Sequence, residues 1–340
     1  MEGQKKKIWI GSRNIWRNNS QILILTGILV TFFVIMSILL PRTFLSRETM
    51  QSMGVQLPEF GIYSIAMMFA MLSGGIDLSI VSIGNLSSII ACQYMISRMA
   101  AGTGGSYMMT VIVGIALACG IGIICGLFNG FSVSVIGIPP MLSTLASMAI
   151  FDGISTILTK GSPLQGLPEE YSVIGSYTLF HMIPMILIIF IVVALAAYVI
   201  LNRTTLGIKI YTVGSNEKAA IFSGIQNTYV IMSVYAISGL LSAIAGIILT
   251  SRSMSAKMDY GSIYQLQAIL AVVLGGVSPK GGAGRVGGVV LAVLSLQILS
   301  TGLNILNLAS TSYLKNLMWG ILLVVVLVMN YFIDKKKSFI

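Results

Sequence analysis

Apolar runs of about 20 residues follow one another along almost the whole chain, separated by short polar or glycine-rich segments. As an α-helix, one such run spans the hydrocarbon core of a bilayer, which is about 30 Å thick. In lipid every backbone polar group needs an internal partner, so these runs predict a helical bundle. The alternating segments of a β-barrel do not occur in the sequence. The pattern therefore predicts an all-α polytopic membrane protein.

The runs predict about ten transmembrane helices, some of them short or broken. Pro41 ends the first run, and the Gly74-Gly75 pair interrupts the second. A polar loop is expected over 41–58. The expected helices cover 21–40, 59–73, 80–96, 107–130, 140–158, 180–201, 229–250, 263–277, 286–305 and 314–332.

Composition and charge agree with this interpretation. Hydrophobic residues make up 56% of the chain and charged residues 9%, against roughly 25% charged residues in soluble domains. The net charge of +10 arises from cations at the ends of apolar runs, which set membrane topology and do not indicate a nucleic-acid partner. Their distribution predicts N-in and C-in, with 1–20 a basic cytoplasmic N-terminus, 21–334 the transmembrane domain and 335–340 a basic cytoplasmic tail.

The central polar segment 204–225, TTLGIKIYTVGSNEKAAIFSGI, separates two long apolar runs and falls on the cytoplasmic side in this topology. Gly214 and Gly224 bracket a sequence that predicts one helix of about two turns. Asn216 or the serine before it suits the N-cap, and Glu217 stands in the first turn, where the helix dipole favours an acid. So short a helix is not stable alone, so it must dock on its own bundle or on a partner.

Few polar residues with possible chemistry lie inside the apolar runs. Asp77, in SGGIDLS, either caps a broken helix or lines a transport pathway. Asp152 is expected near the outer end of its helix in a structural role. Asn85, Gln267 and Asn304 are candidates for the wall of the pathway. With Gln265 and Gln297, the last two either line a wet path or form hydrogen bonds between helices.

The glycine-rich stretch 274–288, LGGVSPKGGAGRVGG, does not fit a nucleotide-binding loop, since Lys280 precedes its glycines and no Ser or Thr follows. It predicts a tight cytoplasmic turn with close helix contacts. Its paired glycines echo those of 73–77, and pairs of interrupted segments often flank a central pathway. Neither a catalytic constellation nor a metal site is indicated: the single histidine, His181, has no partner ligand.

Seven motifs in order resemble the permease subunits of bacterial ABC importers for ribose and related sugars, the branched-chain-permease-like family. They cover most of the chain from 59 to 332. The motifs are SGGIDLS at 73–79, FNG at 128–130, IPPMLSTLASMAIFDGI at 138–154, TTLGIKIYTVGSNEKAAIFSGI at 204–225, SGLLSAIAGIILTSR at 238–252, AVVLGGVSPKGGAGRVGG at 271–288 and TGLNIL at 301–306.

The resemblance implies a translocation subunit without its own ATPase site, located in the bacterial plasma membrane and working by alternating access. It implies cytosolic ABC ATPase subunits that carry ATP and Mg, an extracytoplasmic solute-binding protein, and a second permease subunit, identical or related, within membrane lipid. It also implies that 204–225 contains the helix that couples to the ATPase. The residues that match the family pattern there are Gly214, Asn216, Glu217, Ala219, Ala220 and Gly224.

Three positions depart from the family pattern: Val81, Thr301 and Gly288. These departures weaken the inference that the solute is ribose, and other sugars, signalling sugars and nucleosides stay open. The alternative function is an ion-coupled secondary transporter, which would use Asp77 or Asp152 as its coupling carboxylate and need no partner.

Overall fold

The computed structural model describes residues 22–102, 107–179, 183–306, 315 and 317–328. In this part of the chain eight helices are long and apolar enough to cross a membrane, and two shorter apolar helices accompany them. The predicted cytoplasmic ends, 1–20 and 335–340, and His181 lie outside the described residues. The prediction of an all-α polytopic membrane protein with about ten membrane helices is confirmed.

The long helices are Ile22–Leu39, α2 Arg47–Leu72, α3 Ile80–Ala100, α4 Tyr107–Ser134, α5 Pro140–Thr159, α7 Met185–Arg203, α10 Asn227–Ser253 and α12 Val286–Leu306. The shorter apolar helices are α11 Ser262–Leu274 and Leu317–Val328. The remaining elements are the helices α6 Glu169–Ser176, α8 Thr205–Ser215 and α9 Glu217–Phe222, and the antiparallel strands β1 Thr178–Leu179 and β2 Ile183–Pro184.

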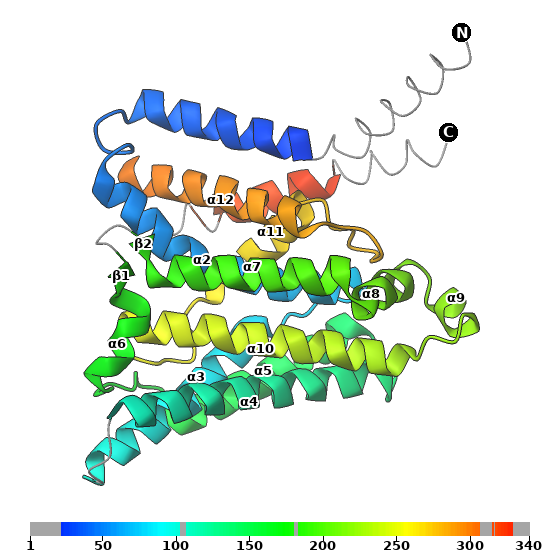
Figure 1. The fold of residues 1–340 in the computed structure, drawn as a ribbon, viewed down its shortest axis with the longest axis horizontal. Coiled ribbons are helices and arrows are strands. Elements are labelled where there is room, and N and C mark those ends of the chain that lie inside the picture. Colours follow the sequence, from blue (N-terminus) through cyan, green and yellow to red (C-terminus); the bar gives the residue numbers. More distant parts are fainter. Residues whose placement is uncertain (1–21, 103–106, 180–182, 307–314, 316, 329–340) are drawn as a thin grey trace.

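The long helices run side by side along one axis of the molecule (Figure 1). α6 and the β1–β2 pair lie at one end, called here the α6 end, and α8 and α9 lie at the other, called the α9 end. The helix Ile22–Leu39 begins on the side of the α9 end, which agrees with a central segment on the same side of the membrane as the N-terminus.

α2 is the central helix of the bundle. Every residue from Leu57 to Leu72 is buried, and the helix contacts α7, α10, α11 and α12. α10 packs closely along α4, where a Cβ at Gly130 would lie 2.9 Å from the backbone of Met232. Small residues at such crossings let helix backbones approach each other, which replaces the hydrophobic driving force that lipid does not provide.

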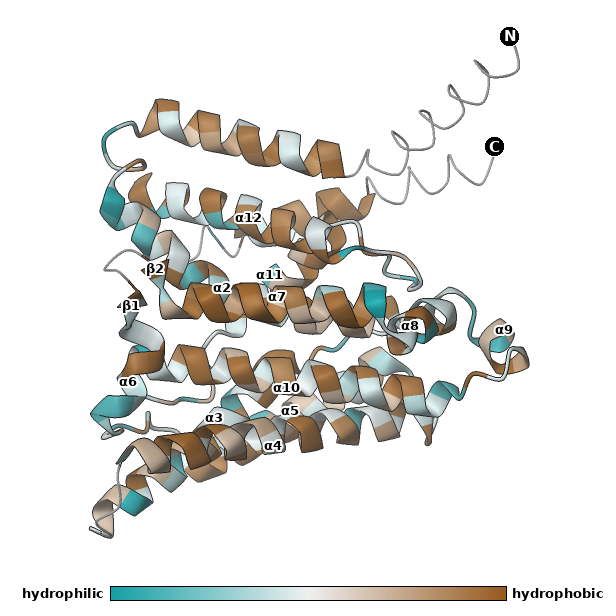
Figure 2. Ribbon diagram, viewed as in Figure 1, coloured by the Kyte–Doolittle hydropathy of each residue, from teal (hydrophilic) through white to brown (hydrophobic). Residues whose placement is uncertain are grey.

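The outward faces of the helices are apolar. Along α7 the side chains of Ile191, Val192, Leu195 and Val199 are large and exposed, and Figure 2 shows hydrophobic colour over much of the length of this helix. A soluble protein rarely exposes a continuous apolar surface of this size. These faces are therefore suited to contact with the acyl chains of a bilayer.

The expected polar loop over 41–58 is wrong, because α2 already begins at Arg47. Ser46 is its N-cap, and the Ser46 hydroxyl accepts a hydrogen bond from the Thr49 amide at 3.2 Å. Pro58 lies inside the helix. A proline removes one backbone hydrogen bond, which membrane helices tolerate where neighbouring groups re-satisfy the backbone.

The connection between the expected helices 140–158 and 180–201 contains α6, which begins at Glu169, and the next helix begins at Met185, after two short strands, and not at 180. Contacts with α10 stabilise this two-turn helix. The Tyr171 hydroxyl donates to the Ile247 carbonyl at 3.1 Å, and the Ser251 hydroxyl donates to the Tyr171 carbonyl at 2.6 Å. Such contacts between distant residues are not visible in local sequence.

Candidate functional site

The central segment 204–225 forms two helices, where one was predicted. Thr204 caps α8 by accepting a hydrogen bond from the Gly207 amide at 3.3 Å. Asn216 ends α8 and caps α9, since its side-chain oxygen accepts from the Ala219 amide at 3.0 Å. The predicted N-cap is thus confirmed. Gly214 precedes α9, as predicted, but it lies within a second helix, α8, which was not predicted.

Gly214 allows α8 to pack closely against the end of α2 and the loop between α11 and α12. A Cβ at this position would overlap the carbonyl oxygen of Leu72, the last residue of α2, and would lie 2.6 Å from the Gly282 amide nitrogen. The Gly282 amide donates to the same Leu72 carbonyl at 3.0 Å. At Gly281, with φ +86°, a Cβ would lie 2.7 Å from the Gly214 oxygen and 2.8 Å from the Cα of Gly74. No larger residue fits this packing.

These contacts define a glycine junction: the end of α2 at 72–75, α8 at 214–215, and the loop between α11 and α12 at 281–282. The prediction that 274–288 makes a tight turn with close helix contacts is confirmed there. The glycines of the loop that reach this junction are 281–282, whereas Gly275, of the pair that echoes 74–75 in the sequence, packs against Val289 of α12. α8 is therefore in direct backbone contact with the ends of two bundle elements.

A tyrosine strengthens the attachment of α8. The Tyr211 hydroxyl donates to the Gly284 carbonyl at 3.0 Å. Burial raises the pKa of the Tyr211 hydroxyl, and the nearby Arg285 opposes that shift. The hydroxyl therefore stays protonated at neutral pH and remains a donor.

α9 extends away from the bundle (Figure 1). Of its six residues only Ala220 is buried, whereas the side chain of Phe222 is 92% exposed and that of Ile221 is 57% exposed. Asn227 fixes the helix from behind by donating to the Glu217 carbonyl at 3.1 Å. Gly224 follows the helix with φ +76°, as its predicted place after the C-cap requires.

The other predicted coupling residues lie on the surface of this helix or next to it. Asn216, Glu217 and Ala219 are exposed. The apolar side chains of α9 are therefore divided: Ala220 is buried against the bundle, and Ile221 and Phe222 are exposed. An exposed phenylalanine on a helix too short to fold alone is typical of a docking element.

Asp77 is fully buried at the turn between α2 and α3. One carboxylate oxygen accepts from the Ser79 amide at 3.0 Å and from the Ser79 hydroxyl at 2.6 Å. The other accepts from the Ser238 hydroxyl of α10 at 2.9 Å, and Asn129 of α4 donates to the Ser79 oxygen at 2.7 Å. Asp77 thus ties the α2–α3 turn to two other helices.

Asn85 and Asn304 belong to two different helices, α3 and α12, and neither bonds to Asp77. The Asn85 side chain donates to the carbonyls of Met258 at 2.6 Å and Tyr260 at 2.9 Å, and so holds the loop before α11 against α3. Asn304 is exposed near the end of α12. Of the four residues predicted to line a pathway, only Gln267 lines a cavity described for this chain.

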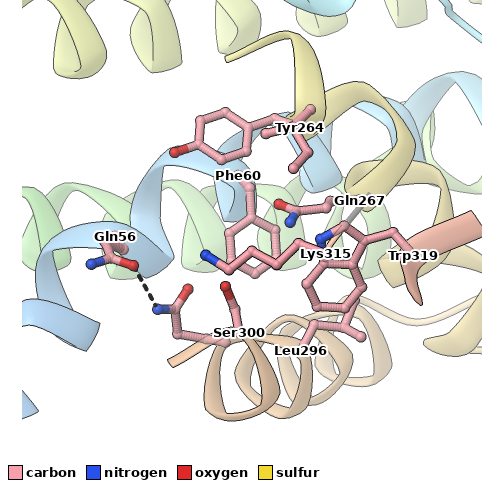
Figure 3. Close-up of a pocket in the computed structure, with 10 residues that line it drawn as sticks. Gln56, Phe60, Tyr264, Gln267, Leu296, Ser300, Lys315 and Trp319 are labelled. Carbon is pink, nitrogen blue, oxygen red and sulfur yellow. Dashed lines mark hydrogen bonds between the residues drawn. The ribbon is translucent and has the colours of Figure 1, made fainter. Parts of the chain in front are cut away.

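That cavity has a volume of about 140 Å³ and lies between α2, α11, α12 and the short helix near the C-terminus (Figure 3). Gln267, 7% exposed, lines it from α11. The lining residues are Gln56, Phe60, Ile263, Tyr264, Gln267, Leu296, Gln297, Ser300, Lys315 and Trp319. The sequence analysis did not predict Gln56, because this residue fell in the expected loop over 41–58. It did not predict Phe60, Tyr264 or Trp319 either, because an aromatic residue within an apolar run does not stand out from its neighbours.

Hydrogen bonds order one wall of the cavity. The Gln297 amide donates to the Gln56 side-chain oxygen at 3.4 Å (Figure 3) and to the Thr301 hydroxyl at 3.1 Å. Gln56 in turn donates to the Ser52 hydroxyl at 2.9 Å. Gln297 therefore bonds between helices, one of its two predicted roles, and lines the cavity as well.

The ion pair between Glu59 and Arg252 lies next to Tyr264, which lines the cavity. The Tyr264 hydroxyl donates to Glu59 at 2.5 Å, and the other Glu59 oxygen pairs with the guanidinium of Arg252 at 2.8 Å. The Glu59 side chain is fully buried, and that of Arg252 is 35% exposed. The pair holds Tyr264 at the cavity wall and connects it with α10 near the α6 end.

α2 and α11 join the cavity to the glycine junction. α2 runs from Gln56 and Phe60 at the cavity to Leu72 at the junction, and the last two are about 18 Å apart at 1.5 Å per residue. α11 runs from Tyr264 and Gln267 at the cavity toward the glycine-rich loop. α2 therefore connects the cavity directly with the junction, and α11 connects with it through the loop that follows Leu274.

The bundle with apolar outward faces and a partly polar cavity is that of a multi-pass membrane protein, and its relatives give the class. Residues 50–327 match the family described as branched-chain amino acid transport system / permease component. The chain belongs to this family of ABC permeases and is a multi-pass protein of the inner membrane.

Its relatives include permeases of simple-sugar importers. The chain is 36% identical to the ribose import permease of Bacillus subtilis (strain 168), with 90% of each chain covered. It is 32% identical to the D-allose transport system permease of Escherichia coli (strain K12), covering 87% of this chain and 89% of the relative. It is 31% identical to the L-arabinose transport system permease of the same strain, with 92% of each covered. No solved structure matches the chain.

Proposed function

We propose that this chain is the translocation subunit of an importer for a sugar or sugar-like solute, powered by separate ATPase subunits through alternating access. The similarity to ribose, allose and arabinose permeases supports the solute class. The observation that carries the mechanism is α9. It presents Phe222, 92% exposed, to a partner, while α8 behind it is packed against α2 and the glycine-rich loop.

In this mechanism the ATPase binds ATP and Mg and receives α9, with Phe222 and Ile221 as its apolar contacts. Closure of the ATPase displaces α9 and α8. Because Gly214 and Gly281 allow backbone-to-backbone packing, a displacement of α8 moves the end of α2 and the loop between α11 and α12. Bistable packing of this kind converts a small displacement into a change of the side to which the pathway opens.

The same proposal includes a second permease subunit, identical or related, and a solute-binding protein at the α6 end. α6 carries Glu169 and Glu170 in its first turn. These acids suit basic residues of such a binding protein, where complementary charge favours association. Asp77, which could serve an ion-coupled transporter instead, gains no support of this kind, since it is committed to three structural hydrogen bonds.

The test is uptake by proteoliposomes that contain this chain with its candidate ATPase and binding protein. ATP enclosed on the ATPase side should drive uptake of radiolabelled D-ribose, D-allose or L-arabinose. Replacing Phe222 by Ala should reduce uptake at least tenfold, since apolar anchors dominate docking interfaces. Replacing exposed Ile157 of α5 by Ala is the control and should change nothing. Uptake by this chain alone, driven by an ion gradient, would refute the proposal.

A further inference from the structure

The cavity of about 140 Å³ between α2, α11 and α12 combines two kinds of surface. Phe60, Tyr264 and Trp319 supply aromatic faces, and the amides of Gln56 and Gln267 supply hydrogen-bonding groups. Figure 3 shows these five side chains converging from different elements. Binding sites for small molecules have this composition: mostly apolar and aromatic walls with a few convergent polar groups.

Two polar groups in this cavity lack partners among the described residues. The Trp319 side chain is fully buried, and its indole N–H has no hydrogen-bond acceptor there. The Gln267 amide, 7% exposed, makes no hydrogen bond within the same part of the chain. An unpaired buried polar group costs roughly the full desolvation of that group. A ligand hydroxyl would remove this cost at Trp319 and would give the Gln267 amide a partner.

Lys315 adds a third donor. Its side chain extends into the cavity (Figure 3), and it has no ion-pair partner in the described part of the chain. Its ammonium group offers three donors and no acceptor. The cavity thus offers donors from Trp319 and Lys315 and a donor–acceptor amide from Gln267.

The other walls are held in place and cannot turn away. Tyr264 is fixed by its hydrogen bond to Glu59, which is itself paired with Arg252. Gln56 is fixed between Ser52 and Gln297. A preformed wall reduces the ordering cost that a weakly held small ligand must overcome.

We propose that this cavity is a binding site for a neutral aldose, with Gln267, Trp319 and Lys315 as its hydrogen-bonding residues and Phe60 as its apolar face. The inference rests on the proposed function, because that function supplies the solute class. A sugar ring presents C–H groups on its faces and hydroxyl groups around its edge. The C–H groups can pack on the ring of Phe60, and the hydroxyl groups can accept hydrogen bonds from the unpaired donors of Trp319 and Lys315.

Trp319 gives a direct test, because the chain has three tryptophans and the other two, Trp9 and Trp16, lie outside the described residues. A W9F/W16F protein in nanodiscs keeps only the cavity tryptophan as a fluorophore. Titration with D-ribose, D-allose or L-arabinose should change its emission saturably for at least one of the three. L-Leucine, a branched-chain amino acid with no ring hydroxyls, should have no effect.

Two variants in the same background locate the site. Gln267→Leu and Lys315→Met should each raise the half-saturating sugar concentration about tenfold, the effect of losing one good hydrogen bond. Gln265→Leu, two residues away on α11 and outside the cavity lining, should leave it unchanged. Each variant is compared only as monodisperse protein of unchanged helix content.

The outcomes separate this inference from the proposed function. No saturable emission change with any of the three sugars, or an unchanged response in both cavity variants, overturns the binding site even where the complete importer takes up sugar. A saturable response that both variants weaken supports the site. If the complete importer then shows no ATP-dependent uptake, the proposed function fails and the site stands.

Discussion

Removal of Arg252 is the sharpest test of the ion pair behind the cavity. The Glu59 side chain is fully buried and depends on Arg252 at 2.8 Å and the Tyr264 hydroxyl at 2.5 Å. Arg252→Leu leaves the carboxylate with Tyr264 alone. Breaking a buried pair from one side costs about 3 to 5 kcal/mol, because the remaining charge is uncompensated. Since the Arg252 side chain is 35% exposed, its own hydration offsets part of the pairing energy, and we expect about 3 kcal/mol.

The partner variant should behave differently. Glu59→Leu removes the buried charge itself and leaves Arg252 able to reach water, so the main loss is the acceptor of the Tyr264 hydroxyl, about 1 to 2 kcal/mol. The double variant should match Glu59→Leu and lie well below the sum of the two single losses. This asymmetry follows from burial of only one member of the pair.

Free energies of unfolding come from SDS titration in mixed micelles, followed by far-UV circular dichroism. Lys257→Leu is the matched control, because Lys257 forms an equally short ion pair of 2.8 Å with Asp259 but on the surface, where such pairs contribute little. Equal losses in Arg252→Leu and Lys257→Leu would refute the reasoning. So would additive losses in the Glu59 and Arg252 double variant.

Three further perturbations probe the central segment and the α2–α3 turn. Asn216→Ala removes the cap of α9 and should cost about 1 kcal/mol in local helix stability, so ATP-driven uptake should fall severalfold while the Trp319 response to sugar is unchanged. Gly214→Ala places a methyl group against the Leu72 carbonyl, and size-exclusion chromatography should show loss of the monodisperse protein. Asp77→Asn should lower thermal stability, because one acceptor oxygen becomes a donor facing Ser79 or Ser238 hydroxyls; the remaining uptake should still require ATP and resist a protonophore.

The first two variants have matched controls, and the third has a contrary outcome. Asn216→Ser retains a capping oxygen and should keep uptake near the wild-type rate. Gly153→Ala in α5 points into open space and should leave the chromatogram unchanged. Uptake by Asp77→Asn that survives ATP depletion, or an intact wild-type protein whose uptake collapses with the proton gradient, would favour the ion-coupled alternative.

Much of the membrane architecture follows from local sequence. Apolar runs long enough to cross a bilayer predict the helices without reference to their neighbours, because lipid forces each backbone polar group to find a partner within its own segment. The break at Gly74 and the helix start at Pro140 appear where the sequence predicts them. The cap at Asn216 is equally local, since a capping side chain bonds three residues ahead.

The same local reasoning failed where tertiary contacts decide. The polar segment before Pro58 reads as a loop, yet it continues α2, whose residues from Leu57 onward are surrounded by four other helices. The sequence of α6 predicts a loop, yet the hydrogen bonds of Tyr171 with α10 stabilise a helix there. In both cases packing overrides a weak local preference.

The candidate site divides in the same way. The sequence by itself predicted that 204–225 lies outside the membrane, and it determined that this segment contains a capped short helix and that Gln267 is a polar residue in an apolar run. Only the tertiary structure decided that Gly214 serves packing against Leu72, that Asp77 is committed to hydrogen bonds, and that Gln56 and Trp319 join Gln267 around one cavity. The reason is physical: helix formation in lipid depends on each segment alone, whereas a cavity or a junction depends on which faces of distant helices meet.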